Sequence, residues 1–381
     1  MAQIAKATPL SGWNRFAGLP RPVAALLIAL LAGLMLLGTV EGRKTVNPNL
    51  TSPALAKAEG MIGDHALYVK ILRKMEAGTP YYDAVVEEHR AYHYPLRPFA
   101  AVRLPTLATI LSITGLPAGI VAASLLGLAT LLAWRRRLMS EPDIPPYSRF
   151  AVLLIAVNLG QLMSGQWVLI HEVVAGALIA LALALYRPER PWAAMAAIAA
   201  ALAIRETVLP VAMLFGLFAF IDRDWRALAG WIVVGAAFAI GILLHAAAVT
   251  AATDPTDLAG GGWLGLGGWN NYISFVYKTS ILRFFAPYWF ATLLVPLSLL
   301  GWLAWRGRLG TAGLMIQLGY AAAFMLFART DNDYWGMLIA PTLFVGLIFS
   351  PAALAALLRS LGVQTKRISS ATAASIPVAG K

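Results

Sequence analysis

The sequence predicts an all-α membrane protein that crosses the bilayer about ten times. The first observation is composition, because 59% of the 381 residues are hydrophobic and only 13% are charged. A soluble globular domain carries about 25% charged residues, so this chain has too little polar surface to face water. The second observation is a series of apolar segments of spanning length. The third is an uneven distribution of cations among the segments that connect them.

The first predicted span covers residues 22–40 and follows a basic N-terminal stretch. At 1.5 Å per residue it is long enough to cross a hydrocarbon core of about 30 Å. No small-residue cleavage site follows it, since the chain continues with the charged segment 41–44. We therefore expect a retained helix here and not a cleaved signal peptide.

Nine further apolar spans are predicted at 115–134, 149–164, 168–186, 192–205, 207–221, 227–250, 286–305, 310–328 and 336–358. The spans 192–205 and 207–221 are short and are separated only by Arg205-Glu206. They form either a tight helical hairpin or one broken pair. The total is therefore about ten, plus or minus about two.

The charges fix an expected orientation. With the N-terminus inside, the cytoplasmic segments hold 17 of the 30 cations and five of the 18 acids, so the whole net charge of +12 lies inside. This positive-inside pattern places a multi-pass protein in the cell's inner (plasma) membrane with both termini cytoplasmic. We expect cytoplasmic tails at 1–21 and 359–381 around a single transmembrane domain, 22–358, with long outer loops at 41–104 and 251–285.

Composition also excludes several classes of function. The positive-inside pattern accounts for the basic pI, so no nucleic-acid partner is expected, and membrane lipids surround the protein. Because the chain has no cysteine, disulfides, zinc thiolates and cysteine nucleophiles are excluded. The histidines expected on the outer side match no metal-binding spacing, so no cofactor is predicted, although the carboxylates leave a divalent metal open. These histidines are His65, His89, His93 and His171.

The first outer loop is predicted to contain interfacial helices. Residues 64–77 place apolar side chains on one helical face and cations on the other, which suits a helix lying in the interface plane. A second short helix is expected at 82–91. The apolar segment 104–113 is too short to span and is expected to dip into the outer leaflet before the turn at 115–117. The loop is thus predicted to build one wall of an outward-facing cavity.

Ionisable residues collect at the predicted outer ends of the helices. Charges at or within a membrane are costly and usually mark function. Helix ends from distant parts of the chain can meet in one site, where carboxylates favour proton abstraction or metal binding and arginines favour phosphate capture. Aromatic rings there favour stacking on a sugar or lipid. The candidate site residues are Asp64, Arg103, His171, Glu172, Arg205, Glu206, Arg329, Asp333, Tyr334 and Trp335.

Several short stretches carry a resemblance to a known superfamily. They are 63–68, 77–82, 94–98 through 103–105, His171-Glu172, Arg205-Glu206 and 332–335. Together with a long outer loop after the first helix, they resemble the GT-C glycosyltransferases, and the first three resemble bacterial mannosyltransferase-like members. These integral membrane enzymes use polyprenyl-phosphate-linked sugars. The likeness in architecture covers most of the chain.

The resemblance implies a membrane glycosyltransferase. Asp64 would be the general base that deprotonates the hydroxyl of a lipid or glycan acceptor, and the sugar would be transferred from the polyprenyl phosphate with inversion. Arg205 and Arg329 would stabilise the leaving phosphate, and Arg103 is a third candidate for this role. The chain departs from the superfamily in its small size and in lacking the extracytoplasmic domain that many members carry, so the resemblance does not indicate how the acceptor is recognised.

Each candidate also has a purely structural interpretation. Asp64 precedes a predicted helix and would serve there as an N-cap. Arg205-Glu206 would be an intramembrane ion pair that pins a hairpin, and His171-Glu172 an interfacial turn. His245 is expected to be a hydrogen-bonded core residue. Residues 331–333 resemble a nucleotide-sugar motif but fall on the outer side, so Asp333 to Trp335 are expected to cap the tenth helix and line the cavity.

Two other functions remain open. A transporter or flippase of a lipid-linked or polar solute should place ionisable residues near the midplane of several helices, often in two related halves. A structural or assembly subunit predicts an outer face without a shared cavity. The charges here collect at one side and no internal repeat is visible, which favours the enzyme.

Overall fold

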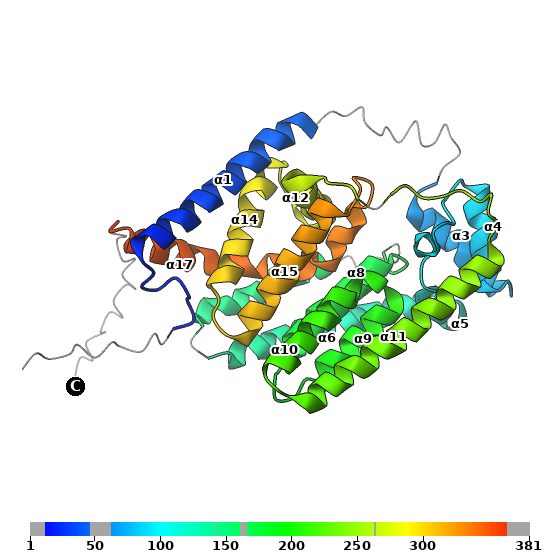
Figure 1. Ribbon diagram of the computed structural model, residues 1–381, viewed down its shortest axis with the longest axis horizontal. Helices are drawn as coiled ribbons and strands as arrows, with labels where there is room; N and C mark the ends of the chain where they lie inside the picture. The colour runs from blue at the N-terminus through cyan, green and yellow to red at the C-terminus, as the bar shows by residue number, and fades with distance from the viewer. Residues whose placement is uncertain are drawn as a thin grey trace, which may run out of the picture.

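The computed structural model describes residues 12–45, 62–142, 144–160, 165, 167–262 and 264–363. Within these ranges the fold is all-α, with sixteen α-helices, short 3-10 helices and only isolated β-bridges (Figure 1). The predicted all-α class is therefore confirmed. Residues 1–11 and 364–381 of the predicted tails, and residues 46–61 of the predicted first outer loop, lie outside the described residues.

Among the described residues, five helical segments are long and apolar enough to cross a membrane, which indicates a multi-pass membrane protein. They are Arg21–Val40 of α1 (Arg21–Thr45), α6 (Leu116–Ser140), α11 (Trp225–Ala252), α15 (Arg308–Leu326), and Ala340–Ser360, formed by α16 (Ala340–Leu343) and α17 (Val345–Ser360). α1, α6 and α11 leave most of their apolar residues on the surface, where lipid can solvate them. α15 and Ala340–Ser360 are more than half buried and form the centre.

Five shorter apolar helical segments coincide with the other five predicted spans. They are η2 and α7 (Pro146–Phe150, Ala151–Leu159), α8 (His171–Leu185), α9 (Trp192–Ile204), η4 and α10 (Glu206–Val208, Leu209–Ile221), and α14 (Trp289–Ala304). At 1.5 Å per residue, helices of this length reach only about 20–24 Å. The positions of the apolar helices are thus confirmed, while the number that cross the bilayer is not established by length.

Glycines let the central helices approach closely. α14 and α17 cross at Gly301 and Gly346, where an added Cβ on Gly301 would lie 1.7 Å from the Gly346 carbonyl oxygen. An added Cβ on Gly176 of α8 would lie 2.2 Å from the Met337 carbonyl oxygen. This second approach sets η5 (Asp333–Leu338), which carries Tyr334, against the N-terminal half of α8.

The segment predicted to be the first outer loop folds into a helical subdomain. It contains α3 (Asp64–Glu76), α4 (Tyr81–Ala91), η1 (Phe99–Ala101) and α5 (Thr106–Thr114). The apolar face of α3 is buried against α4 and α5 through Leu67, Ile71 and Leu72. The predicted helices are present, but protein and not lipid covers the apolar face of α3. Figure 1 shows the subdomain beside the C-terminal end of α11.

The second predicted outer loop, 251–285, includes two helices. It contains α12 (Gly268–Thr279) and α13 (Leu282–Phe285). α12 buries Tyr272, Ile273 and Val276, whose spacing of three and four residues forms a helical face. The sequence did not predict this helix, because the neighbouring Gly-rich segment obscured the helical period.

Part of the predicted N-terminal tail is packed against the protein. Asn14 forms a bridge with Trp305, the Arg15 N–H donates to the Ala304 carbonyl at 2.8 Å, and the Arg306 N–H donates to the Trp13 carbonyl at 2.6 Å. This short pairing ties the start of α1 to the connection between α14 and α15.

Candidate functional site

Two cavities share one polar wall. The first, of about 340 Å³, is lined by Arg103 and Arg329 and is named the arginine cavity. The second, of about 520 Å³, is lined by Glu172, Lys278 and Asp333 and is named the lysine cavity. The residues that line both are Asp64, Tyr68, Asp331 and Tyr334. Side chains from the predicted first outer loop, α8, α12 and the segment before α16 are thereby brought together.

Asp64 occupies this shared wall at the first position of α3. Gly63 is the N-cap residue and makes no side-chain cap bond, so Asp64 does not have the predicted capping geometry. Its Oδ1 accepts a hydrogen bond from the Tyr94 hydroxyl at 3.0 Å, a hydroxyl that also contacts the Ile62 carbonyl. Burial raises the pKa of Asp64, and the Arg103 charge and the Tyr94 hydrogen bond oppose that rise. A partly desolvated carboxylate with a raised pKa is a better proton acceptor.

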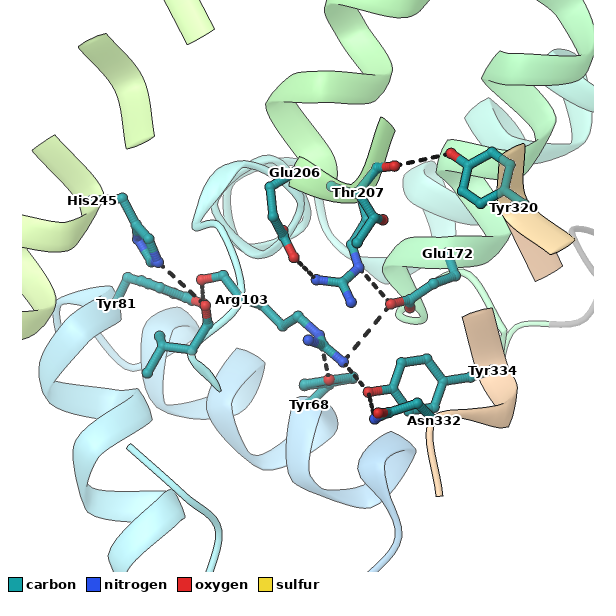
Figure 2. A network of polar contacts seen from close by, with 12 residues as sticks. Tyr68, Tyr81, Arg103, Glu172, Glu206, Thr207, His245, Tyr320, Asn332 and Tyr334 are labelled. Carbon is teal, nitrogen blue, oxygen red and sulfur yellow. Dashed lines mark hydrogen bonds and ion pairs between the residues drawn. The ribbon is translucent and has the colours of Figure 1, made fainter. Parts of the chain in front are cut away.

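Arg103 extends into the arginine cavity and is held mainly by neutral groups. Its Nε donates to the Tyr68 hydroxyl at 3.1 Å, and its Nη2 donates to the Tyr334 hydroxyl at 2.9 Å (Figure 2). The guanidinium carbon also lies 5.3 Å from the centre of the Tyr334 ring, a cation–π contact. Burial lowers the pKa of His89 to about 4, so this cavity residue is neutral at pH 7. The positive charge here comes from the arginines.

Glu172 and Arg205 form a buried ion pair behind the cavities. The Arg205 Nε lies 2.6 Å from Glu172 Oε1, and both side chains are 1% exposed. Arg205 is paired on its other side with Glu206. Glu172 reaches the lysine cavity, whereas Arg205 lines neither cavity. Of the two arginines expected to bind phosphate, Arg329 therefore reaches a cavity and Arg205 is enclosed by carboxylates.

The segment 329–333 carries two more ion pairs. The Arg329 Nε lies 3.1 Å from Asp331 Oδ1, and the Lys278 Nζ lies 3.0 Å from Asp333 Oδ2. Each of these four side chains is at least a third exposed, so the pairs are weak and exchangeable. Arg329 and Lys278 can thus be displaced from their carboxylates by a charged ligand.

Three other residues singled out from the sequence lie away from the two cavities. His171 is buried behind Tyr68, with ring centres 5.4 Å apart. Trp335 is buried beside an apolar groove between α10 and α15. His245 is a hydrogen-bonded core residue, as expected, because its ring nitrogens contact the Tyr82 hydroxyl at 3.1 Å and the Val102 carbonyl at 3.2 Å.

A second apolar groove, of about 640 Å³, runs between α9 and α11 and is named the α9–α11 groove. Small residues such as Ala203 and Gly241 leave space between the two helices. The groove also reaches Leu104, the residue that follows Arg103. The segment that carries Arg103 into the polar cavity therefore also borders this apolar groove.

Sequence reasoning missed three contributors. Tyr68 and Tyr94 lie inside the stretches that carry the superfamily resemblance, but neither was selected as a site residue. Lys278 lies in the last turn of α12, inside a segment expected to be a loop. A correct helical period for α12 would have placed Lys278 at a helix end, where the other candidate residues collect.

Within the described ranges, no group of three His, Asp or Glu side chains is placed to hold a metal. No protein-family model, no curated protein and no solved structure matches the chain. The cavities themselves combine a desolvated carboxylate, a buried guanidinium and exchangeable ion pairs. That set can bind an anion and accept a proton next to it.

Proposed function

We propose that the protein is a membrane glycosyltransferase that moves a sugar from a polyprenyl phosphate donor to a lipid or glycan acceptor. The observation that carries this proposal is the position of Asp64 and Arg103 on one cavity, with Asp64 also facing a second. A transferase needs a base next to the acceptor and a cation next to the leaving group. The resemblance of the outer loop to GT-C enzymes adds the expected donor class.

In the proposed reaction, Asp64 removes the proton of an acceptor hydroxyl. The hydroxyl oxygen forms a bond to the anomeric carbon while the bond from that carbon to the phosphate oxygen breaks, which inverts the configuration. The phosphate leaves with the bonding electrons and its charge develops beside Arg103, with Arg329 as a second cation at the cavity wall. The α9–α11 groove receives the hydrocarbon chain of the donor.

The proposed topology has ten crossings, both termini in the cytoplasm and the two cavities on the outer face. Contacts among the described residues support it. Segments expected inside contact one another, as in the ion pair between Arg308 and Asp222. Segments expected outside also contact one another, as in the pairing of Arg90 with Asp257 at 2.7 Å. Ten crossings require each short helix to be matched by local thinning of the bilayer or by its protein neighbours.

The proposal is tested with purified protein in vesicles that contain labelled polyprenyl-phosphate sugars and an extract of membrane lipids. Transfer of label to a new lipid or glycan product supports the enzyme. Movement of intact donor between leaflets without a new glycosidic product would instead establish a flippase. If neither reaction occurs with a full panel of hexose and pentose donors, both functions are contradicted.

A further inference from the structure

One carboxylate oxygen stands between two guanidinium groups. Glu172 Oε1 lies 2.6 Å from the Arg205 Nε and 3.8 Å from the Arg103 Nη2. Figure 2 shows Glu172 and Arg103 pointing toward one another. The Glu172 and Arg205 side chains are 1% exposed and that of Arg103 is 10% exposed, so water does not screen this arrangement. The carboxylate is therefore shared unequally, and Arg205 holds it more closely.

The unequal sharing leaves Arg103 with neutral partners. Its two close hydrogen bonds go to the phenol oxygens of Tyr68 and Tyr334, which orient the guanidinium without neutralising it. A guanidinium that is oriented but not neutralised is a strong ligand for a phosphate. A closely paired guanidinium would first have to give up its carboxylate.

Arg205 itself is not available to a ligand. It is enclosed by Glu172 and Glu206, and it lines neither the arginine cavity nor the lysine cavity. Without Arg205 the buried carboxylate of Glu172 would need another cation, because an unpaired buried charge is costly. Arg103, already 3.8 Å away, is the nearest candidate.

We propose that Arg205 is a positioning residue that keeps Glu172 engaged, so that Arg103 stays free to bind the anionic group of the ligand. The inference rests on the proposed function only in assigning a phosphate to Arg103. When Arg205 is removed, Glu172 should pair with Arg103 and weaken the binding of the anionic ligand. Neutralising both residues should therefore restore the binding affinity that is lost when Arg205 alone is neutralised.

The experiment measures binding of decaprenyl phosphate, which carries no sugar, to purified protein through intrinsic tryptophan fluorescence. We expect Arg205→Gln to weaken binding by about tenfold or more. The double variant Arg205→Gln with Glu172→Gln should return to within about threefold of the native affinity. Glu172→Gln alone should also bind within about threefold of native, and this variant leaves no unpaired buried carboxylate if Arg205→Gln fails to fold.

Three outcomes would overturn the inference. Native affinity in a folded Arg205→Gln protein would show that Arg205 does not control Arg103. A double variant as weak as the single one would show that Glu172 does not compete for Arg103, and so would weak binding by Glu172→Gln. If the native protein fails to bind decaprenyl phosphate at all, the proposed function falls together with the inference. If one of those three variant results is found while native binding is normal and depends on Arg103, only the role of Arg205 is rejected.

Discussion

At the scale of single residues, the site depends on how charges are paired. Arg205 and Glu172 neutralise one another, whereas Arg103 is held by phenols and Asp64 by a tyrosine hydroxyl. The sequence indicates that acids and arginines gather at helix ends, but it does not reveal which pairs form. That choice depends on distances of a few ångströms between segments far apart in the chain, such as Arg103 and Tyr334.

Arg103→Gln should weaken the binding of a polyprenyl-phosphate sugar by about tenfold to a hundredfold. The variant loses charge-assisted hydrogen bonds to phosphate, each contributing about 1.5–3 kcal/mol. KM and direct binding measure the effect. Arg73→Gln, on the exposed side of α3 in the same subdomain, is the control and should bind like the native protein. Equal binding by the two variants would remove Arg103 from the donor site.

Tyr94→Phe should move the acidic limb of the pH–rate profile to higher pH. The Tyr94 hydrogen bond lowers the pKa of Asp64, so its removal lets burial raise that pKa further. Because the proposed base works as a carboxylate, a higher pKa means that activity is lost at a higher pH as the solution is acidified. Tyr92→Phe, which removes a hydroxyl not bonded to Asp64, should leave the limb unchanged. A limb that stays in place in Tyr94→Phe would argue against Asp64 as the titrating group.

At the scale of elements, apolar runs predict helices well and predict packing poorly. All ten predicted spans overlap apolar helices of the structure, because a long apolar run can be identified as a helix without knowing which segments pack against it. α12 was missed since its apolar face is interrupted by asparagines and preceded by glycines. The α3 helix was found, but its amphipathic pattern alone does not distinguish a lipid surface from a covering of α4 and α5.

The α9–α11 groove gives a prediction about one helix. Gly241 lines this groove and a Cβ added there would meet no atom within 4 Å, so we expect Gly241→Leu to occupy part of the groove without disturbing the fold. We expect a KM for long polyprenyl donors raised by about tenfold, and little change for a donor with a short isoprenoid chain. Gly235→Leu is a matched control, because Gly235 lies on the same helix, is equally unobstructed and does not line the groove. Equal KM values for the two variants would show that the hydrocarbon chain of the donor does not bind in the α9–α11 groove.

At the scale of the whole molecule, the charge distribution and the tertiary contacts divide the connecting segments into the same two groups, one expected inside and one expected outside. The basic segments contact one another, as Arg187 Nη2 does with Ser140 Oγ at 2.9 Å, and the candidate site lies among segments of the opposite group. The sequence predicts this separation because cations near spans are retained inside during insertion. It does not predict the shape of the cavities, which depends on close approaches such as Gly176 to Met337.

The topology can be mapped directly because the native chain has no cysteine. Single cysteines at the exposed positions Ala77 and Glu189 should react differently with a membrane-impermeant maleimide. In intact cells we expect Ala77→Cys to be labelled and Glu189→Cys to be labelled only after permeabilisation. The reverse pattern would invert the orientation and place the cavities in the cytoplasm.

The most direct measurement compares sugar transfer by the native protein and by Asp64→Asn at saturating donor, with donor binding measured in parallel. We predict that Asp64→Asn binds the polyprenyl-phosphate sugar and transfers it about 10² to 10⁴ times more slowly, because the proton acceptor is lost. Asp83→Asn, at an exposed position on α4, should transfer at the native rate. Transfer by Asp64→Asn at the native rate would contradict the proposal that the acceptor hydroxyl is deprotonated at the wall between the two cavities.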